Sequence, residues 1–265
     1  MSNNMMYTAI SGLDTFSSAL SVISDNIANA NTTAYKSNTL DFGDLVSGFL
    51  PTTNVHSTAQ GVGSMVLGVT SDFGTGGQIQ TGTWSNLMIQ GNGFFCVQDP
   101  TTKTDYYTRD GSFQLGADGY LEDMHGNQVL ESDGKTPIQI EAKPATPVYS
   151  SYAIDKFGNV TGTAASGTVT TIGQIGVTTF PNPNGLIRDG QNMYTPGSSA
   201  GAAILGTAGS GQAGPITSGT LEGSNVDLTT QMVDLITYQA DYQANSKSVQ
   251  TGNDLLQTVV NLKTS

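Results

Sequence analysis

Charged residues are scarce in this sequence, and basic residues are the scarcest of them. The 265 residues include 9 Lys and Arg against 21 Asp and Glu, which gives a formal net charge of −12. A chain with this balance repels a phosphate backbone, so the composition argues against nucleic acid as a partner. The sequence also contains a single cysteine, Cys96, which excludes an internal disulfide. Its place in the apolar run 93–97 predicts a buried strand residue.

Long apolar runs are absent as well. No stretch of about 18 apolar residues occurs, and residues 1–7 show neither the basic start nor the long apolar core of a signal peptide. We therefore expect no membrane insertion and no cleaved signal peptide. If the protein is exported, a dedicated secretion machine must read its address from the mature chain.

Residues that carry enzyme chemistry are few and scattered. The two histidines, His56 and His125, lie in or beside turn-rich segments without a Cys or a second His at metal-ligand spacing. Gly91 and Gly93 lack the third glycine and the following helix of a nucleotide loop, and predict a hairpin turn. A glycosidase needs only two acids, but the spacing selects no pair from the candidates Asp105, Asp110, Asp118, Glu122 and Asp123. We predict a protein that is not an enzyme, with no catalytic residue, metal or cofactor.

Both ends of the chain show an apolar repeat of seven residues. In residues 4–30 one position of the repeat holds Met6, Leu13, Leu20 and Ile27, and the position three residues later holds Ala9, Phe16, Ile23 and Ala30. This pattern predicts a helix with a narrow coiled-coil seam. The other faces carry mainly Ser, Thr, Asn and Asp, so the helix should be marginal on its own.

A second helix is predicted from an N-cap at Ser224, with Asp227 three residues later, to Leu262. Its first seam position holds Leu228, Leu235, Tyr242, Val249 and Leu256. Its alternate position holds Met232, Gln239, Ser246, Asn253 and Val260. Polar side chains thus interrupt the apolar line, and such residues fix register and partner at a cost in stability.

Between the helices the pattern changes to short apolar runs broken by Asp-Gly and Asn-Gly turns, which are typical of β hairpins. We predict an α+β fold, with the N- and C-terminal helices paired as a coiled-coil-like terminal domain and a mainly β domain inserted between them. The expected domains are residues 1–36 and 220–265 for the helical domain, 37–75 for an extended connector, 76–196 for the β domain, and 197–219 for a Gly-, Ala- and Ser-rich linker.

Three groups of motifs, in the correct order, resemble the flagellar rod and hook protein family. The first helix ends in Asn26-Ile27-Ala28-Asn29, followed by a Thr and then by Tyr35-Lys36. The β region holds Gly91-Asn92-Gly93-Phe94-Phe95 and Tyr107-Thr108-Arg109-Asp110-Gly111, and the C-terminal region holds Leu221-Glu222-Gly223 and Tyr242-Gln243-Ala244-Asn245. Two positions depart from the family pattern: Thr33-Ala34 replaces a Gly-containing turn, and Ala240-Asp241 replaces a basic residue before Tyr242.

The resemblance implies a structural subunit of a helical tube, with the terminal helices lining a central channel and the β domain outside. Two narrow seams also leave apolar surface uncovered, and a head-to-tail contact that does not close produces a filament. The expected assembly interface combines both seams with the asparagine turn: Met6, Leu13, Phe16, Leu20, Ile23, Asn26, Ile27, Asn29, Leu228, Met232, Leu235, Tyr242, Val249 and Leu256.

The implied partners are copies of the same chain, adjacent axial proteins (rod, hook, hook–filament junction and hook cap) and the flagellar type III export apparatus. The implied location is the flagellar hook or basal body. Our first assignment is the hook, the joint that transmits motor torque to the filament, and the alternative is the distal rod. A phage-tail-like structural protein and a secreted polysaccharide-active enzyme are further alternatives.

Overall fold

The computed structural model describes residues 2–46, 61–141 and 149–264. The described residues of Met1–Ala30, Ser37–Asp72 and Val226–Ser265 form a helical unit, and those of Asn31–Lys36 and Phe73–Asn225 form a β unit. The predicted α+β class, with a helix near each end of the chain and a mainly β middle, is confirmed.

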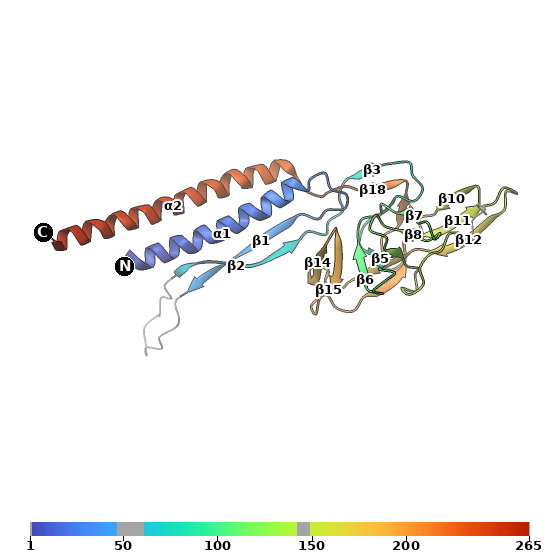
Figure 1. Ribbon diagram of the computed structural model, residues 1–265, viewed down its shortest axis with the longest axis horizontal. Coiled ribbons are helices and arrows are strands. Elements are labelled where there is room, and N and C mark those ends of the chain that lie inside the picture. Colours follow the sequence, from blue (N-terminus) through green and yellow to red (C-terminus); the bar gives the residue numbers. More distant parts are fainter. Residues whose placement is uncertain (1, 47–60, 142–148, 265) are drawn as a thin grey trace. The chain divides into compact units, whose positions relative to one another are not determined.

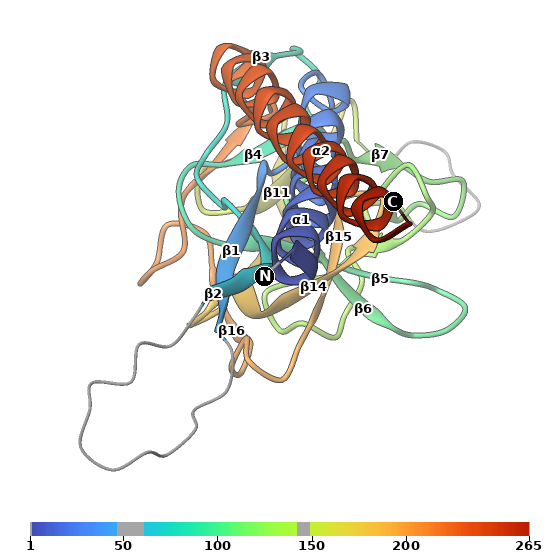
Figure 2. The ribbon, with the colours of Figure 1, turned by 90° about the vertical axis from the view of Figure 1, so that its left-hand side faces the viewer.

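The helical unit contains two long helices and one β hairpin. Helix α1 (Ser2–Ala28) lies between α2 (Leu228–Thr264) and the antiparallel hairpin of β1 (Asn38–Val46) and β2 (Gly61–Ser71) (Figure 1). Figure 2, turned by 90°, again shows the hairpin beside α1. The two helices run antiparallel. Residues distant in sequence therefore build one unit, as the sequence predicts for the helices.

The hairpin is a difference from the sequence analysis, which expected an extended connector over residues 37–75. Its strands pair from Asn38 opposite Ser71 onward, and Asp72 N–H donates to Ser37 O at 2.8 Å. Leu40 is buried. The physical reason is that a two-stranded ribbon gains independent stability only by packing one face on another element, and α1 supplies that face.

The N-cap of helix α2 lies three residues after the expected one. Thr229 N–H donates to Asp227 Oδ1 at 2.9 Å, and Thr230 Oγ1 donates to Asp227 Oδ2 at 2.8 Å. The backbone carbonyl of Asp227 accepts the first helical hydrogen bond, from Gln231 N–H at 3.0 Å. Asp227 is therefore the N-cap residue instead of Ser224, because its carboxylate satisfies donors of the first turn.

The β unit is built from short strands. A nine-stranded sheet runs in the order β14-β15-β6-β5-β9-β8-β7, and β13 pairs with both β5 and β16. A three-stranded sheet, β10-β11-β12, and the pairs β17-β4 and β18-β3 complete the unit. The elements are β3 (Gln78–Gln80), β4 (Leu87–Ile89), β5 (Phe94–Gln98), β6 (Asp105–Thr108), β7 (Gln114–Leu115), β8 (Leu121–Glu122), β9 (Gln128–Val129), β10 (Ser151–Ile154), β11 (Asn159–Thr163), β12 (Val169–Gln174), β13 (Gly176–Thr179), the 3-10 helix η1 (Pro183–Gly185), β14 (Leu186–Gly190), β15 (Met193–Pro196), β16 (Ile204–Thr207), β17 (Ile216–Ser218) and β18 (Thr220–Glu222).

Strand β5 is covered by apolar side chains on both faces. Phe95 and Val97 belong to one apolar cluster of the β unit, and Phe94 and Cys96 belong to a second. Successive residues of a strand point to opposite sides of the sheet, so the run 93–97 fills both clusters. The prediction that Cys96 is a buried strand residue is confirmed. Burial raises the pKa of the Cys96 thiol to about 12, and the nearby charge of Asp105 contributes to the rise.

Two turns of the β unit share the design Asp-x-x-Gly-Asn. In the turns that start at Asp123 and Asp155, the Asp Oδ1 accepts the backbone N–H groups two and four residues later at 2.8 to 2.9 Å. The Asn side chain donates to the Asp Oδ2 at 2.8 Å in the first turn and at 2.9 Å in the second. Gly126 and Gly158 have φ angles of 86° and 81°, which favour glycine. Each turn is therefore held by its own Asp and Asn side chains and by a glycine at a positive φ angle.

Residues 197–219, expected as a linker, contribute two strands to the β unit. Strand β16 pairs with β13, and β17 pairs with β4. Ala208 and Ile216 are buried in the first apolar cluster. Backbone hydrogen bonds in a ladder do not require large side chains, so a segment rich in Gly and Ala can join a sheet whose core other strands supply.

Candidate assembly interface

The predicted seam of α1 forms one continuous stripe along the helix. Ala9 and Ile23 are buried, and the other predicted seam residues are half-buried: Met6, Leu13, Phe16, Leu20, Ile27 and Ala30. The Phe16 ring lies 5.9 Å from the Tyr238 ring on α2 and 6.0 Å from the Phe42 ring on β1, measured between centroids. The stripe thus contacts both neighbours of α1 within the chain.

Helix α2 faces α1 with a line of residues that the sequence analysis did not select. Gln231, Tyr238, Asn245 and Gly252, spaced by seven, each lie three residues after a predicted first-seam position. Gln231 Oε1 accepts a hydrogen bond from Asn26 Nδ2 at 2.9 Å. The predicted alternate position lies one residue further along, and its first member, Met232, is 53% exposed. The sequence analysis missed the contact line because polar residues and a glycine occupy it.

Small residues let the two helices approach closely. A Cβ atom added at Gly12 would lie 3.0 Å from Asn245 Nδ2, and one added at Gly252 would lie 3.0 Å from Met6 Cγ. These distances are shorter than ordinary van der Waals contact, so a side chain at either position would require the Asn245 or Met6 side chain to shift by a few tenths of an ångström. The glycines therefore belong to the helix contact although they carry no apolar side chain.

The remaining residues of the predicted α2 seam divide between two environments. Leu235, Val249 and Leu256 are half-buried, whereas Leu228 and Tyr242 are exposed at 41% and 39%. The first group lies on the side of α2 that contacts α1. The second group is accessible to another molecule.

Asn26 ties three elements of the helical unit together. Its Nδ2 donates to Asn38 O at 2.8 Å and to Gln231 Oε1 at 2.9 Å, and its Oδ1 accepts Asn38 N–H at 2.9 Å. The side chain is 1% exposed, so these bonds satisfy an amide that burial would otherwise destabilise. Asn29 Nδ2 donates to the backbone carbonyl and side chain of Asp25 in the last turn of α1. Both asparagines thus make hydrogen bonds within the chain.

Large apolar side chains lie exposed on α2. Near its start, Val233 and Ile236 are 57% and 67% exposed. The helical period turns these two residues and Met232 away from the line that faces α1. Further along, Leu255, Val260 and Leu262 are exposed as well. An apolar face on both sides of a helix is unusual for a helix that serves one chain only.

Strand β2 carries a second exposed apolar line that the sequence analysis missed. Met65, Leu67 and Val69 are all exposed, and a register shift against β1 at Leu67 breaks the regular alternation of the strand between them. The signal was available in the sequence as an alternation within 61–71, inside the segment expected as a connector. The helical unit therefore presents apolar surface on a helix and on a strand.

Comparisons with known proteins match the chain almost throughout. Family models described as "Flagella basal body rod protein", "Flagellar hook protein FlgE/F/G D1 domain" and "Flagellar basal body rod FlgEFG protein C-terminal" match residues 6–36, 88–162 and 217–262. The flagellar basal-body rod protein FlgG of Bacillus subtilis (strain 168) is 36% identical over 268 positions, which cover 97% of this chain and 98% of the relative. The chain belongs to the flagellar rod and hook protein family.

Other members of this family are similar along their whole length too. The FlgG protein of Agrobacterium fabrum (strain C58 / ATCC 33970) is 30% identical, with 95% of this chain and 96% of the relative covered. The flagellar hook protein FlgE of Escherichia coli (strain K12) is 25% identical over 407 positions, with 96% and 99% covered. The chain is a structural subunit of the flagellar axis, located in the basal body or hook.

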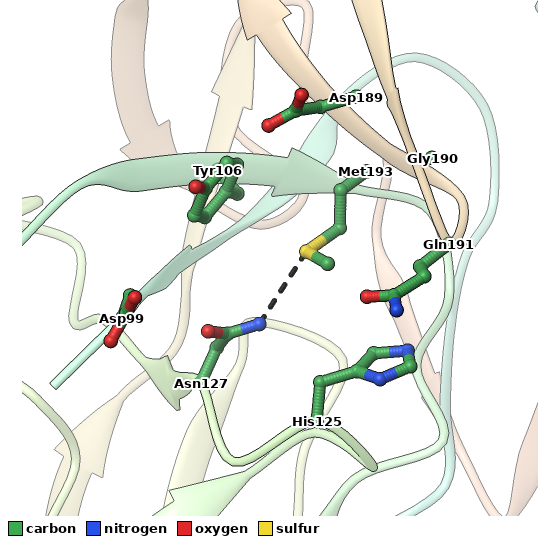
Figure 3. Close-up of a pocket in the computed structure, with 8 residues that line it drawn as sticks. All are labelled: Asp99, Tyr106, His125, Asn127, Asp189, Gly190, Gln191 and Met193. Carbon is green, nitrogen blue, oxygen red and sulfur yellow. Dashed lines mark hydrogen bonds between the residues drawn. The ribbon is translucent and has the colours of Figure 1, made fainter. Parts of the chain in front are cut away.

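Acidic side chains of the β unit lie at and near one surface pocket. A surface pocket of about 680 Å³ is lined by Asp99, Tyr106, His125, Asn127, Asp189, Gly190, Gln191 and Met193. Figure 3 shows Asn127 and Met193 pointing toward each other, and Asn127 Nδ2 lies 3.4 Å from Met193 Sδ. His125 is exposed. In the part of the chain that the structure describes, no three His, Cys, Asp or Glu side chains are grouped to hold a metal ion.

Two of the five acids singled out from the sequence, Asp110 and Asp123, are engaged in turns, and Asp105 and Glu122 lie in strands β6 and β8. Asp123 accepts hydrogen bonds within its Asp-x-x-Gly-Asn turn, and Asp110 Oδ1 accepts Ser112 N–H at 3.0 Å. Burial raises the pKa of Asp110, and hydrogen bonds from Ser112 oppose that rise. Carboxylates that accept hydrogen bonds from nearby backbone N–H groups in this way stabilise turns. His56 lies outside the described residues.

No helix among the described residues combines the length and the apolar character that a membrane span requires.

Proposed function

We propose that this chain is a subunit of the flagellar rod. The observation that carries the proposal is the length of its relatives. Rod proteins named FlgG align with it from end to end without a large insertion, whereas the alignment with the hook protein FlgE extends over 407 positions against 265 residues here. A hook protein of that kind contains a large segment with no counterpart in this chain. The rod, the alternative in the sequence analysis, is therefore favoured over the hook.

In this proposal the exposed apolar side chains of the helical unit join neighbouring copies. Removing apolar surface from water stabilises a contact by about 25 cal/mol per Å². Met232, Val233 and Ile236 on α2, with Leu67 and Val69 on β2, supply that surface. A contact that repeats head-to-tail without closing produces a helical polymer, and hence a tube.

The half-buried seam residues have a different part in the same proposal. Leu13 and Leu20 on α1, with Leu235, Val249 and Leu256 on α2, hold the two helices together as a short antiparallel coiled coil. Exposed members of the predicted interface, such as Leu228 and Tyr242, contact the next copy. Asn26 and Asn29, through their hydrogen bonds within the chain, hold the end of α1 in the arrangement that forms the seam between the helices and leaves the contact residues exposed.

The proposed partners are copies of this chain, adjacent rod proteins and the hook. Export through the flagellar type III apparatus, without cleavage of a signal peptide, belongs to the same proposal. Membership of the rod and hook family supports both points.

Electron microscopy of basal bodies from a strain that lacks this chain distinguishes rod from hook. If the chain is a rod subunit, the purified basal bodies should lack a complete rod and should carry no hook. Expression of the wild-type chain from a plasmid should restore both structures and serves as the control. Basal bodies with a complete rod and only the hook missing would assign the chain to the hook instead.

A further inference from the structure

Three charged side chains are buried together in the β unit. Lys36 Nζ lies 2.6 Å from Glu222 Oε1, and neither side chain is accessible to solvent. Arg109 Nη1 lies 3.7 Å from Glu222 Oε2, and the Arg109 side chain is also buried. Glu222 Oε2 and Arg109 Nε make no hydrogen bond to the described residues, so the second carboxylate oxygen relies on the nearby guanidinium charge. Two cations thus share one carboxylate.

The Lys36–Glu222 pair also holds the backbone of neighbouring segments. Lys36 Nζ donates to Gly74 O at 2.7 Å, and Gly76 N–H donates to Glu222 Oε1 at 2.9 Å. Ala34 N–H donates to the backbone carbonyl of Glu222 at 2.8 Å. Residues 31–36, 73–76 and strand β18 are therefore joined at one point.

Arg109 anchors this point to the body of the β unit. Its Nη1 donates to Gly91 O at 2.7 Å, and its guanidinium carbon lies 5.1 Å from the centroid of the Phe94 ring in the core. Residues 31–36, in contrast, belong to the β unit while residues of the helical unit precede and follow them in the chain. Lys36 is the charged side chain that this short segment contributes.

Each member of the cluster comes from a different segment matched by a family model. Lys36 lies in the match over 6–36, Arg109 in the match over 88–162, and Glu222 in the match over 217–262. The sequence analysis quoted all three residues in separate motifs. The fold therefore brings three separate motifs to one buried set of charges.

Buried charges of this kind can favour one arrangement of the chain over all others even where they add little to the free energy of unfolding. Apolar side chains of similar volume would often be as stable, but a displaced segment would separate Lys36 from its carboxylate partner and leave Glu222 with Arg109 alone. We propose that Lys36, Arg109 and Glu222 form a register lock, which admits a single docked position of residues 31–36 on the β unit. The lock does not depend on whether the chain builds a rod or a hook.

Hydrogen exchange of the full-length purified chain, followed by mass spectrometry, tests the lock with Lys36→Met. The substitution removes the charge of Lys36 but leaves Glu222 beside Arg109, so the charges that remain are balanced. We expect amides of 31–36 to exchange at least about tenfold faster, while those of β5 stay protected. If Lys36 merely neutralised Glu222, the segment would keep its protection, because Arg109 still supplies a positive charge.

A second variant and a control keep the test decisive. Lys36→Met combined with Glu222→Gln retains the net charge of the wild-type cluster, so its urea midpoint should exceed that of Glu222→Gln alone, which leaves two buried cations. Residues 31–36 should nevertheless exchange rapidly in the double variant. Lys135→Met, at an exposed position of the same unit, should change neither measurement. Wild-type protection of 31–36 in Lys36→Met or in the double variant would overturn the proposal.

Discussion

At the scale of single residues, polar side chains and glycines determine how the elements of this subunit meet. Asn26 makes three hydrogen bonds while almost fully buried, and they connect α1 with β1 and α2. A buried amide with all these partners fixes one arrangement, since any other would leave polar groups unsatisfied. Gly12 and Gly252 contribute through the absence of a side chain. A Cβ atom added at either position would lie only 3.0 Å from a side-chain atom of the other helix.

The two Asp-x-x-Gly-Asn turns allow a matched test of one glycine against another. At Gly126 an added Cβ meets no atom within 4 Å, so Gly126→Ala should cost about 1 kcal/mol from the positive φ alone. At Gly158 the added Cβ would lie 2.9 Å from Ile175 O, so Gly158→Ala should destabilise the β unit further. Urea unfolding followed by the fluorescence of Trp84, the single tryptophan, measures both. Equal losses in the two variants would contradict the close contact at Gly158.

At the scale of elements, the sequence predicts the helices more completely than their contacts. Both helices and the seam of α1 follow from the repeat of seven, because apolar residues mark that face throughout. The contact line of α2 does not, because Gln231, Asn245 and Gly252 carry no apolar signal and their part depends on where α1 lies. The hairpin was missed for a related reason: residues 47–60 separate its strands, so no short turn motif marks the pair.

The start of α2 provides a prediction on pH. Hydrogen bonds from the Thr230 side chain and the Thr229 N–H lower the pKa of Asp227 below 3.8. A carboxyl with a lowered pKa in the folded state stabilises it above the unfolded pKa, and this contribution is lost as the pH falls through the folded value. Asp227→Asn keeps a capping side chain without the charge, whereas Asp227→Ala removes the cap.

Thermal unfolding followed by circular dichroism at 222 nm measures this effect. At pH 7 the midpoint should fall in the order wild type, Asp227→Asn, Asp227→Ala. The difference between wild type and Asp227→Asn should disappear as the pH is lowered from about 4 to about 2, since the carboxyl is then neutral. A difference of constant size over that range would contradict the capping charge.

At the scale of the whole molecule, the two ends of the chain join one compact unit with the β1–β2 hairpin, and most of the middle forms a second unit. The sequence predicts this division because its apolar pattern changes from a repeat of seven near the ends to short runs broken by turns in the middle. Its motifs also resemble those of the flagellar rod and hook proteins, and this resemblance implies a structural subunit. Which apolar residues are left exposed could not be predicted, because both burial within the chain and contact between copies produce the same apolar repeat. The structure shows which of these residues are buried within the chain and which are exposed.

The most direct test of assembly through the helical unit is a charge placed on the exposed face of α2. Val233→Asp combined with Ile236→Asp should prevent polymerisation, because a contact between copies would bury two carboxylates, each at a cost of several kcal/mol. Ser166→Asp combined with Thr168→Asp, at two exposed positions of the β unit, adds the same charge outside this face and is the matched control. Both variants should fold like the wild type by circular dichroism and tryptophan fluorescence. Electron microscopy of basal bodies from a strain that expresses each variant as its only copy then gives the answer. We predict no complete rod with the double variant and normal rods with the control. Rods of normal length and number built from the double variant would contradict the central claim.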